Sequence, residues 1–266
     1  MIGKLRVEPG RPAGLAERDP RDTLGLEKHE GERLLAELDG RLGVLQQRLY
    51  AESTRSVLLV LQGLDASGKD GVIRRVFTGI SPQGCRVASF GVPSETELAH
   101  DYLWRVHAQL PARGEIGIFN RSHYEDIVAV RVRGLAPEDV WRPRAGHIRE
   151  WERMLVDEGT TLVKVFLNVS QEEQRQRLQE RLDDPEKRWK FRRGDLEDRA
   201  RWDAFVEAYE QAITETSTAW APWHVVPADR NWLKAVAVAK LLVDALERLD
   251  PRLPEPEEGL GGLVIE

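Results

Sequence analysis

The hydrophobic and polar positions along the chain form short apolar runs that alternate with longer segments of helical spacing. Apolar runs at residues 57–61, 86–90, 116–119, 161–169 and 223–226 have the length and composition of strands. Leucines at three- and four-residue steps predict a helix over 26–51, and further helices are expected at 146–157 and 231–249, the last with Asp229 near its cap. Capping pairs predict two more, one from Ser94 and Glu97 to about residue 110 and one from Ser170 and Glu173. This alternation predicts an α/β fold with a central five-stranded parallel sheet and helices on both faces.

The segments outside this pattern divide the chain into four parts. Residues 1–24 are rich in Pro, Gly, Arg and Asp, and we expect an extended arm that packs on the surface or on a neighbouring copy. Residues 25–52 form an N-terminal helix whose apolar face packs on the core or, alternatively, makes a dimer seam. Residues 53–250 are the main domain, with an insertion at about 175–201. The Pro- and Glu-rich tail, 251–266, is expected to be loose.

The amino-acid composition argues against a nucleic-acid-binding, disulfide-bonded or membrane-spanning protein. The chain has 39 Lys and Arg against 45 Asp and Glu, a net charge of −6, which argues against binding of nucleic acid by bulk charge. Cys85 is the single cysteine, so no internal disulfide is possible. The polar start has no apolar signal core, and no apolar run approaches the roughly 20 residues of a membrane span. We therefore expect a soluble, cytoplasmic protein that does not bind a membrane.

The first strand runs directly into a glycine-bounded loop, GLDASGK, at residues 63–69. Gly63 and Gly68 bracket four residues and Lys69 follows, so backbone N–H groups from Gly63 through Ala66 and Ser67 to Gly68 can surround a phosphate. The alternative is a tight strand-to-helix turn without a ligand. A standard phosphate loop has Ser or Thr after the lysine to hold magnesium, but this chain has Asp70.

Asp65, inside the loop, is the nearest candidate to hold the metal ion instead. A carboxylate that points into a phosphate site is unfavourable unless a cation lies between them.

A dense polar cluster follows the third strand. Residues 120–126 read NRSHYED and lie directly at the carboxyl end of the run 116–119. In open parallel sheets ligands bind at this edge, so we expect the cluster to lie beside the loop.

The insertion is the clearly basic part of the chain. Residues 175–201 hold ten basic and seven acidic residues, and Asp184 and Pro185 interrupt the helix there. We interpret the segment as a mobile cationic lid over phosphates, and a solvated helical hairpin with local ion pairs is the alternative. The lid's extended basic face combines aromatic anchors, Trp189 and Phe191, with four cations, Lys187, Lys190, Arg192 and Arg193.

Four motifs, in this order, resemble the polyphosphate kinases of the second type, which phosphorylate nucleotides with inorganic polyphosphate. GLDASGKDG at 63–71 resembles that family's variant Walker A loop, including the aspartates at 65 and 70. FNRSHYED at 119–126 resembles the second motif, DDPEKRWKF at 183–191 the lid signature, and APW at 221–223 the late strand entry. The resemblance implies a P-loop kinase three-layer α/β/α sandwich of the thymidylate-kinase-like type. NRSHYED resembles in particular the subgroup that accepts both AMP and ADP.

The resemblance also implies roles for single residues. Lys69 and the loop, through Asp70, would hold the reacting phosphates, and Mg²⁺ or Mn²⁺ would bind Asp65 with Asp126 as helper. Arg121 would grip the nucleotide's phosphate; the alternative is a structural salt bridge to Glu125. Arg181 and the lid cations would stabilise charge in the transition state.

Asn120 stands where many family members have Asp, and a neutral amide supplies no charge to a metal ion. We therefore expect Asn120, with Arg121 and Glu125, at the nucleotide. His123 and His147 are expected to be ordinary polar packing residues.

The implied partners are inorganic polyphosphate, AMP, ADP and ATP, in a homo-oligomer that binds no nucleic acid. Two other functions remain open at this point. An ATP-dependent nucleotide kinase would use the same fold and loop, and a non-catalytic polyphosphate or nucleotide sensor would keep the loop for binding alone.

Overall fold

The five predicted strands form one parallel sheet. The computed structural model describes residues 2–258, and the strand order is β2-β3-β1-β4-β5. The strands span Ser56–Gln62 (β1), Cys85–Ser89 (β2), Ile116–Asn120 (β3), Thr160–Asn168 (β4) and Trp223–Pro227 (β5). All seven residues of β1 are buried, because strands pair with it on both sides and helices cover both faces. The predicted α/β fold with a central parallel sheet is confirmed.

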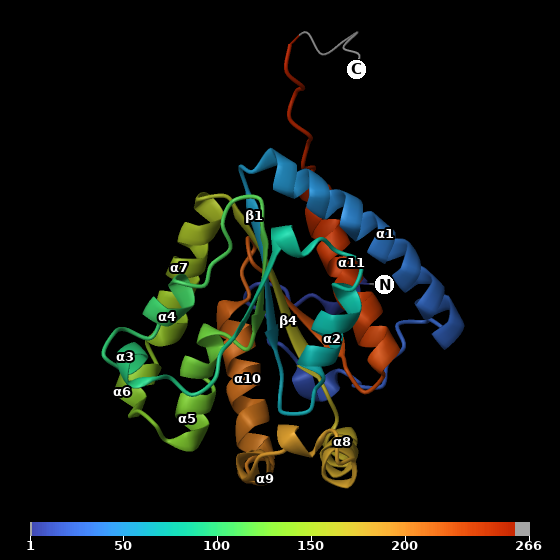
Figure 1. Ribbon diagram of the computed structural model, residues 1–266. Helices are drawn as coiled ribbons and strands as arrows, with labels where there is room; N and C mark the ends of the chain where they lie inside the picture. The colour runs from blue at the N-terminus through green and yellow to red at the C-terminus, as the bar shows by residue number, and fades with distance from the viewer. Residues whose placement is uncertain (1, 259–266) are drawn as a thin grey trace.

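Helices cover both faces of the sheet (Figure 1). On one face lie α1 (Lys28–Glu52), α2 (Lys69–Val76) and α11 (Asn231–Leu249), and on the other α5 (Ala129–Arg133), α7 (Arg144–Asp157) and α10 (Trp202–Thr216). The longer remaining helices are α8 (Gln171–Asp183) and α9 (Arg193–Ala200). The short elements are α3 (Glu95–Leu98), α4 (Trp104–His107), α6 (Glu138–Trp141) and the 3-10 helices η1 (Ile2–Leu5), η2 (Leu15–Glu17), η3 (Pro82–Gly84), η4 (His123–Asp126) and η5 (Arg188–Lys190). None of the described helices is both long enough and apolar enough to span a bilayer.

The N-terminal helix belongs to the core. Leu35, Leu38, Leu42 and Leu49 of α1 are 3% exposed or less, and α1 packs along α11 (Figure 1). The apolar face predicted from the leucine spacing is therefore covered by the chain's own last helix, as the core-packing interpretation expected.

The N-terminal arm covers one edge of the sheet. Arg6 forms an antiparallel bridge with His224, and the backbone N–H of Val7 donates to the carbonyl of Trp223 over 2.8 Å. Leu5 and Val7 are 2% and 1% exposed. The arm thus packs on its own chain and satisfies part of the edge strand β5.

The predicted extent of one helix was wrong. The helix expected from Ser94 to about residue 110 keeps its capping box but divides into α3 and α4. The side chain of Asp101 accepts the N–H groups of Leu103 and Trp104 at 3.0 and 3.1 Å, which starts a new turn there. Asp229 lies near the cap of α11 as predicted, directly before the N-cap residue Arg230, but both of its oxygens accept hydrogen bonds from Ser170, at the start of α8.

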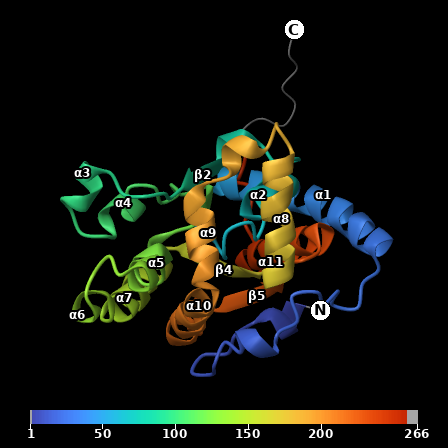
Figure 2. The ribbon, with the colours of Figure 1, turned by 90° about the horizontal axis from the view of Figure 1, so that it is seen from below.

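The carboxyl ends of the strands lie on the side where α8 and α9 cross the molecule. Seen from that side, α8 and α9 lie next to each other in front of the sheet (Figure 2). α8 ends at Asp183, so the helix stops where Asp184 and Pro185 were predicted to interrupt it. Residues 251–258 contain no helix or strand, and 259–266 of the predicted tail lie outside the described residues. The predicted insertion is therefore placed across the edge where ligands bind in this kind of sheet.

Candidate active site

The predicted phosphate loop joins the central strand β1 to α2. Gly63 and Gly68 have φ angles of 150° and 98°, and Ala66 also has a positive φ, of 59°. A Cβ atom at Gly63 would lie 2.8 Å from Ser67 Oγ and 2.9 Å from the carbonyl oxygen of Leu167. Only glycine fits so tight a turn. Left-handed residues in such a turn bring successive N–H groups to one side, which creates an anion-binding concavity.

Lys69 lies over this loop with its side chain almost fully buried. Its Nζ donates to the carbonyl oxygens of Gly63 at 2.7 Å and Leu64 at 3.2 Å, and it lies 3.4 Å from Ser67 Oγ. Burial, together with the charge of Arg121, lowers its pKa to about 8. The ammonium group is therefore desolvated, which strengthens its attraction for a phosphate.

The second motif brings a guanidinium group to the loop. Arg121 directly follows β3 and has a φ of 63°, and its N–H donates to the carbonyl of Leu61 over 3.0 Å. This left-handed residue turns the chain at the sheet edge, and the side chain pairs there with Asp65 and with Glu125, the latter at 3.1 Å. The charge of Glu125 has the largest effect on Arg121 and raises its pKa. Burial acts in the opposite direction but is outweighed. The structure thus brings together Asp65, Lys69, Arg121 and Glu125.

Opposing effects act on the carboxylate of Asp65. Burial would raise its pKa, but the charges of Arg121 and Lys69, with a contribution from Arg181, hold it below its ordinary value. Asp65 is therefore ionised at neutral pH, as a metal ligand must be. Asn120, which directly precedes Arg121, donates an amide N–H to the carboxylate of Asp70 over 2.7 Å.

Asp126 faces a different set of partners. Its carboxylate lies 3.9 Å from Arg105 and 3.8 Å from Arg144. Burial raises its pKa to about 6, although both arginines act to lower it. Between residues 2 and 258, no group of three or more His, Cys, Asp or Glu side chains is arranged to hold a metal ion. Mg²⁺ is commonly held by one or two carboxylates together with substrate phosphates. Asp65 suits this role, whereas at Asp126 two guanidinium groups would compete with a metal ion for the carboxylate.

The predicted lid residues fall into two groups. Arg181, on α8, lies 3.5 Å from Asp195 and close enough to Asp65 to lower its pKa. The other four cations lie around η5 and the start of α9 and are mostly exposed. Lys187 pairs with Asp184 at 2.8 Å, and Lys190 Nζ lies 5.1 Å from the centre of the Trp189 ring. Arg192 and Arg193 lie at the start of α9. Trp189 is 76% exposed. Arg181 therefore belongs to the loop's surroundings, and the remaining cations form an outer group.

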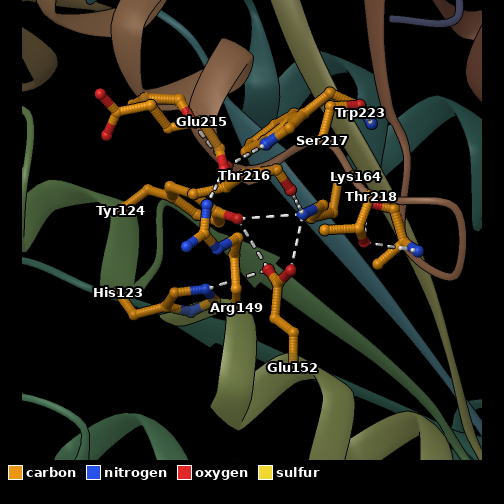
Figure 3. A network of polar contacts seen from close by, with 12 residues as sticks. His123, Tyr124, Arg149, Glu152, Lys164, Glu215, Thr216, Ser217, Thr218 and Trp223 are labelled. Carbon is orange, nitrogen blue, oxygen red and sulfur yellow. Dashed lines mark hydrogen bonds and ion pairs between the residues drawn. The ribbon is translucent and has the colours of Figure 1, made fainter. Parts of the chain in front are cut away.

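A buried polar network lies behind the second motif (Figure 3). Glu152 of α7 accepts from Tyr124 Oη at 2.7 Å and lies 3.4 Å from His123 Nε2. Lys164 of β4 donates to Glu152 at 2.6 Å, to Tyr124 Oη at 3.0 Å and to the carbonyl of Thr216 at 2.7 Å. His123 is thus a packing residue as predicted, while His147 is exposed on α7. The network ties η4, which carries Glu125, to α7, β4 and α10.

Sequence reasoning missed Glu152 and Lys164. Glu152 reads as one more charge on an amphipathic helix, but Lys164 is the one charge in the apolar run VKVFLNV at 163–169. A lysine in a strand buried on both faces needs a buried partner. That signal pointed to an ion pair, although not to its partner.

The fold and this site together define a class: a P-loop phosphotransferase, in which a glycine-bounded loop and its lysine follow the central strand of a parallel sheet. The family model for polyphosphate kinase 2 matches residues 25–254. The chain belongs to that family.

Known proteins resemble the chain over nearly its whole length. It is 58% identical over 265 residues to the AMP/ADP-polyphosphate phosphotransferase of Meiothermus ruber, covering 99% of both chains. It is 46% identical over 240 residues to the ADP-polyphosphate phosphotransferase of Rhodopseudomonas palustris, covering 86% of this chain and 83% of that protein. The crystal structure of polyphosphate kinase 2 from Arthrobacter aurescens TC1 superposes with a TM-score of 0.93 at 44% identity, covering 97% and 92% of the two chains. The P-loop kinase fold expected from the motifs is therefore confirmed.

Proposed function

We propose that this protein transfers a phosphoryl group from inorganic polyphosphate to AMP and to ADP, forming ADP and ATP. The observation that carries the proposal is the convergence of Asp65, Lys69 and Arg121 at the carboxyl edge of the sheet, under the helices of the cationic insertion. The name of the Meiothermus ruber relative supports both acceptors. The reaction exchanges one phosphoanhydride bond for another, so it is reversible in principle.

The proposed residues act by position and charge. A terminal oxygen of the acceptor's phosphate attacks the last phosphorus of the polyphosphate, and the bond to the next phosphate breaks, which shortens the chain by one unit. Lys69 and the loop N–H groups hold the transferred group, and Arg121 holds the acceptor phosphate with its planar fork. Arg181 adds positive charge where the bridging oxygen becomes negative.

The proposed metal ligand is Asp65. Mg²⁺, or Mn²⁺ in its place, would neutralise the phosphate oxygens of the donor and the acceptor when bound. Asp65 is ionised, and its present partner is the guanidinium of Arg121. Asp126 was expected as a second ligand, and a metal ion there would compete with Arg105 and Arg144 for its carboxylate. We also propose a cytoplasmic location and a homo-oligomeric assembly.

The decisive experiment supplies polyphosphate as the sole phosphoryl donor. ATP formed from ADP, and ADP formed from AMP, are measured with Mg²⁺ present, and parallel reactions contain ATP and AMP without polyphosphate. The proposal expects turnover in the first set. Turnover in the second set alone would identify an ATP-dependent nucleotide kinase, and tight polyphosphate binding without turnover would identify a sensor.

A further inference from the structure

The outer side of the phosphate loop is held by side chains from two helices. Gln174 of α8 donates to the carbonyl oxygen of Asp65 over 3.0 Å. Arg177 of α8 donates to the carbonyl oxygens of Ala66 and Ser67 at 3.0 and 3.1 Å. Lys234 of α11 donates to that of Ser67 over 2.9 Å. Three consecutive loop carbonyls are therefore fixed by α8 and α11, whereas Lys69 binds the two carbonyls before them, those of Gly63 and Leu64.

The orientation of these carbonyls sets the orientation of the donors that a phosphate needs. In a planar trans peptide, the C=O of one residue and the N–H of the next point in opposite directions. With the carbonyls of Asp65 and Ser67 held toward α8 and α11, the N–H groups of Ala66 and Gly68 point away from these helices. The N–H of Ser67 closes the turn onto Leu64 over 3.1 Å. We propose that Gln174, Arg177 and Lys234 are positioning residues, which hold the loop peptides so that their N–H groups face the polyphosphate. This proposal rests on the proposed function and deepens it at the donor site.

The burial of Lys234 supports a dedicated role. The residue is 2% exposed, and its Nζ also lies 3.4 Å from the carbonyl of Ala228. Burial, with the charge of Arg177, lowers its pKa to about 7. An apolar side chain of similar volume would avoid the desolvation cost of an ammonium group. A lysine buried here therefore lowers the stability of the fold relative to an apolar residue, and its hydrogen bond to the loop gives a reason for its presence.

Lys234 also adds a second constraint at Gly68. A Cβ atom there would lie 2.1 Å from Lys234 Nζ. Even a residue that tolerated the φ of 98° would thus displace the ammonium group from the loop carbonyl. The glycine before the catalytic lysine serves both the turn and the close approach of Lys234.

The same contacts join the loop to the insertion. Arg177 lies one turn before Arg181 on α8, and its Nη2 donates to the carbonyls of Ala228 and Asp229 at 2.8 and 2.9 Å. A single guanidinium group thus fixes the base of α8 to the phosphate loop and to the segment between β5 and α11. α8 is therefore tied to the loop, unlike the mobile lid expected for the insertion, and Arg181, one turn after Arg177, has a defined position relative to the loop N–H groups.

The test replaces Lys234 by methionine, which keeps the length of the side chain and removes the donor. Lys240→Met is the matched control, because Lys240 lies on the same helix and pairs with Asp244 near the surface. We expect Lys234→Met to raise the KM for polyphosphate at least about tenfold, as the loss of one charge-assisted hydrogen bond that orders the loop would do. The KM for ADP should stay within about twofold. Calorimetry with tripolyphosphate should show the same loss of affinity.

Binding of tripolyphosphate separates this proposal from the proposed function, because it is measured without turnover. A wild-type protein that binds tripolyphosphate but forms no ATP contradicts the function alone. A folded Lys234→Met variant with wild-type tripolyphosphate affinity overturns the positioning role, and so does an equal rise of both KM values. If Lys234→Met does not fold, Gln174→Leu removes one neutral hydrogen bond to the loop, together with the one that the side-chain oxygen of Gln174 accepts from Arg199. The proposal then requires a selective rise in the polyphosphate KM, and an unchanged value overturns it.

Discussion

The buried pair of Glu152 and Lys164 allows a quantitative prediction for Lys164→Met. Both side chains are fully buried, and Lys164 donates three hydrogen bonds, to Glu152, to Tyr124 and to the carbonyl of Thr216. Methionine fills a similar volume without a charge or a donor. The variant therefore keeps the packing of β4 but leaves the carboxylate of Glu152 buried without a cation, apart from what His123 supplies.

Removing one partner of a buried ion pair costs about 3–5 kcal/mol, because the remaining charge has lost its compensation. For a domain of this size, each kcal/mol lowers Tm by roughly 2–4 °C, so we expect a fall of roughly 6–20 °C. Replacing Glu152 by methionine as well removes the uncompensated charge. The double variant should therefore be more stable than Lys164→Met alone, and the two changes should not be additive.

The loss should also depend on pH. In the wild type, burial would raise the pKa of Glu152, but Lys164 outweighs it and holds the pKa below its ordinary value. Without Lys164 the folded-state pKa rises above the unfolded one, so the folded state of the variant binds more protons. Its stability then falls as pH rises from about 4.5 through the raised pKa. Protonation of His123, which lies 3.4 Å from Glu152, acts in the same direction.

Thermal melts followed by circular dichroism at pH 5 and pH 8 measure both effects. We expect the gap between the variant and the wild type to be smaller at pH 5. Arg153→Met, which removes an exposed ion pair with Asp157 on α7, is the control and should change stability by less than about 1 kcal/mol. A loss below about 1 kcal/mol for Lys164→Met, an equal loss at both pH values, or strict additivity in the double variant would refute the reasoning.

Three further predictions address the proposed site. Lys69→Ala should lower kcat by a factor on the order of 10² or more while the circular dichroism spectrum is unchanged, because it removes a cation that stabilises the transition state; a variant with more than half the activity contradicts this role. Lys190→Glu or Arg193→Glu should raise the KM for polyphosphate more than that for ADP, with a weaker dependence on salt than the wild type, and salt-independent wild-type affinity for the donor argues against a lid. Glu125→Asn should change the ratio of AMP to ADP turnover by at least about threefold, roughly 0.6 kcal/mol in relative barrier, measured at saturating polyphosphate. An unchanged ratio would leave Glu125 with its structural ion pair to Arg121 alone.

The sequence predicted the elements that have strong local causes. The closing helix occupies residues 231–249 as expected, and each strand begins and ends within one residue of the predicted run. Local capping was read correctly at Ser94 and Ser170, whose hydroxyls accept the N–H groups of Glu97 and Glu173. The helix break that was not predicted depends on competition between a side chain and the helix for backbone N–H groups. Asp101 interrupts its helix because its carboxylate captures two N–H groups, a choice that periodicity does not record.

The candidate site was predicted as a set of motifs but not as a geometry. Adjacent residues of η4 point in different directions: Glu125 pairs with Arg121, whereas Asp126 lies between Arg105 and Arg144. From the sequence, Glu125 was expected at the nucleotide and Asp126 as a helper at the metal ion, so both carboxylates were expected in one site. The partners of Asp126 come from α4 and α7, two other elements that the fold brings to η4, so only the tertiary structure identifies them.

Charge balance explains why so acidic a chain can take a polyanion as its donor. The net charge of −6 is spread over 266 residues, whereas Lys69, Arg121, Arg177, Arg181 and Lys234 lie around one loop. At an ionic strength of about 0.15 M the Debye length is roughly 8 Å, so carboxylates on distant surfaces are screened from a phosphate in the loop. The buried cations are screened much less. Arg177 and Lys234 are bound to the carbonyls of Ala66 and Ser67, so they contribute a fixed field and hold the loop, while Lys69 and Arg121 are the groups proposed above to contact phosphate. Added salt should therefore weaken the exposed lid contacts first and leave the preference of the loop for phosphate largely unchanged.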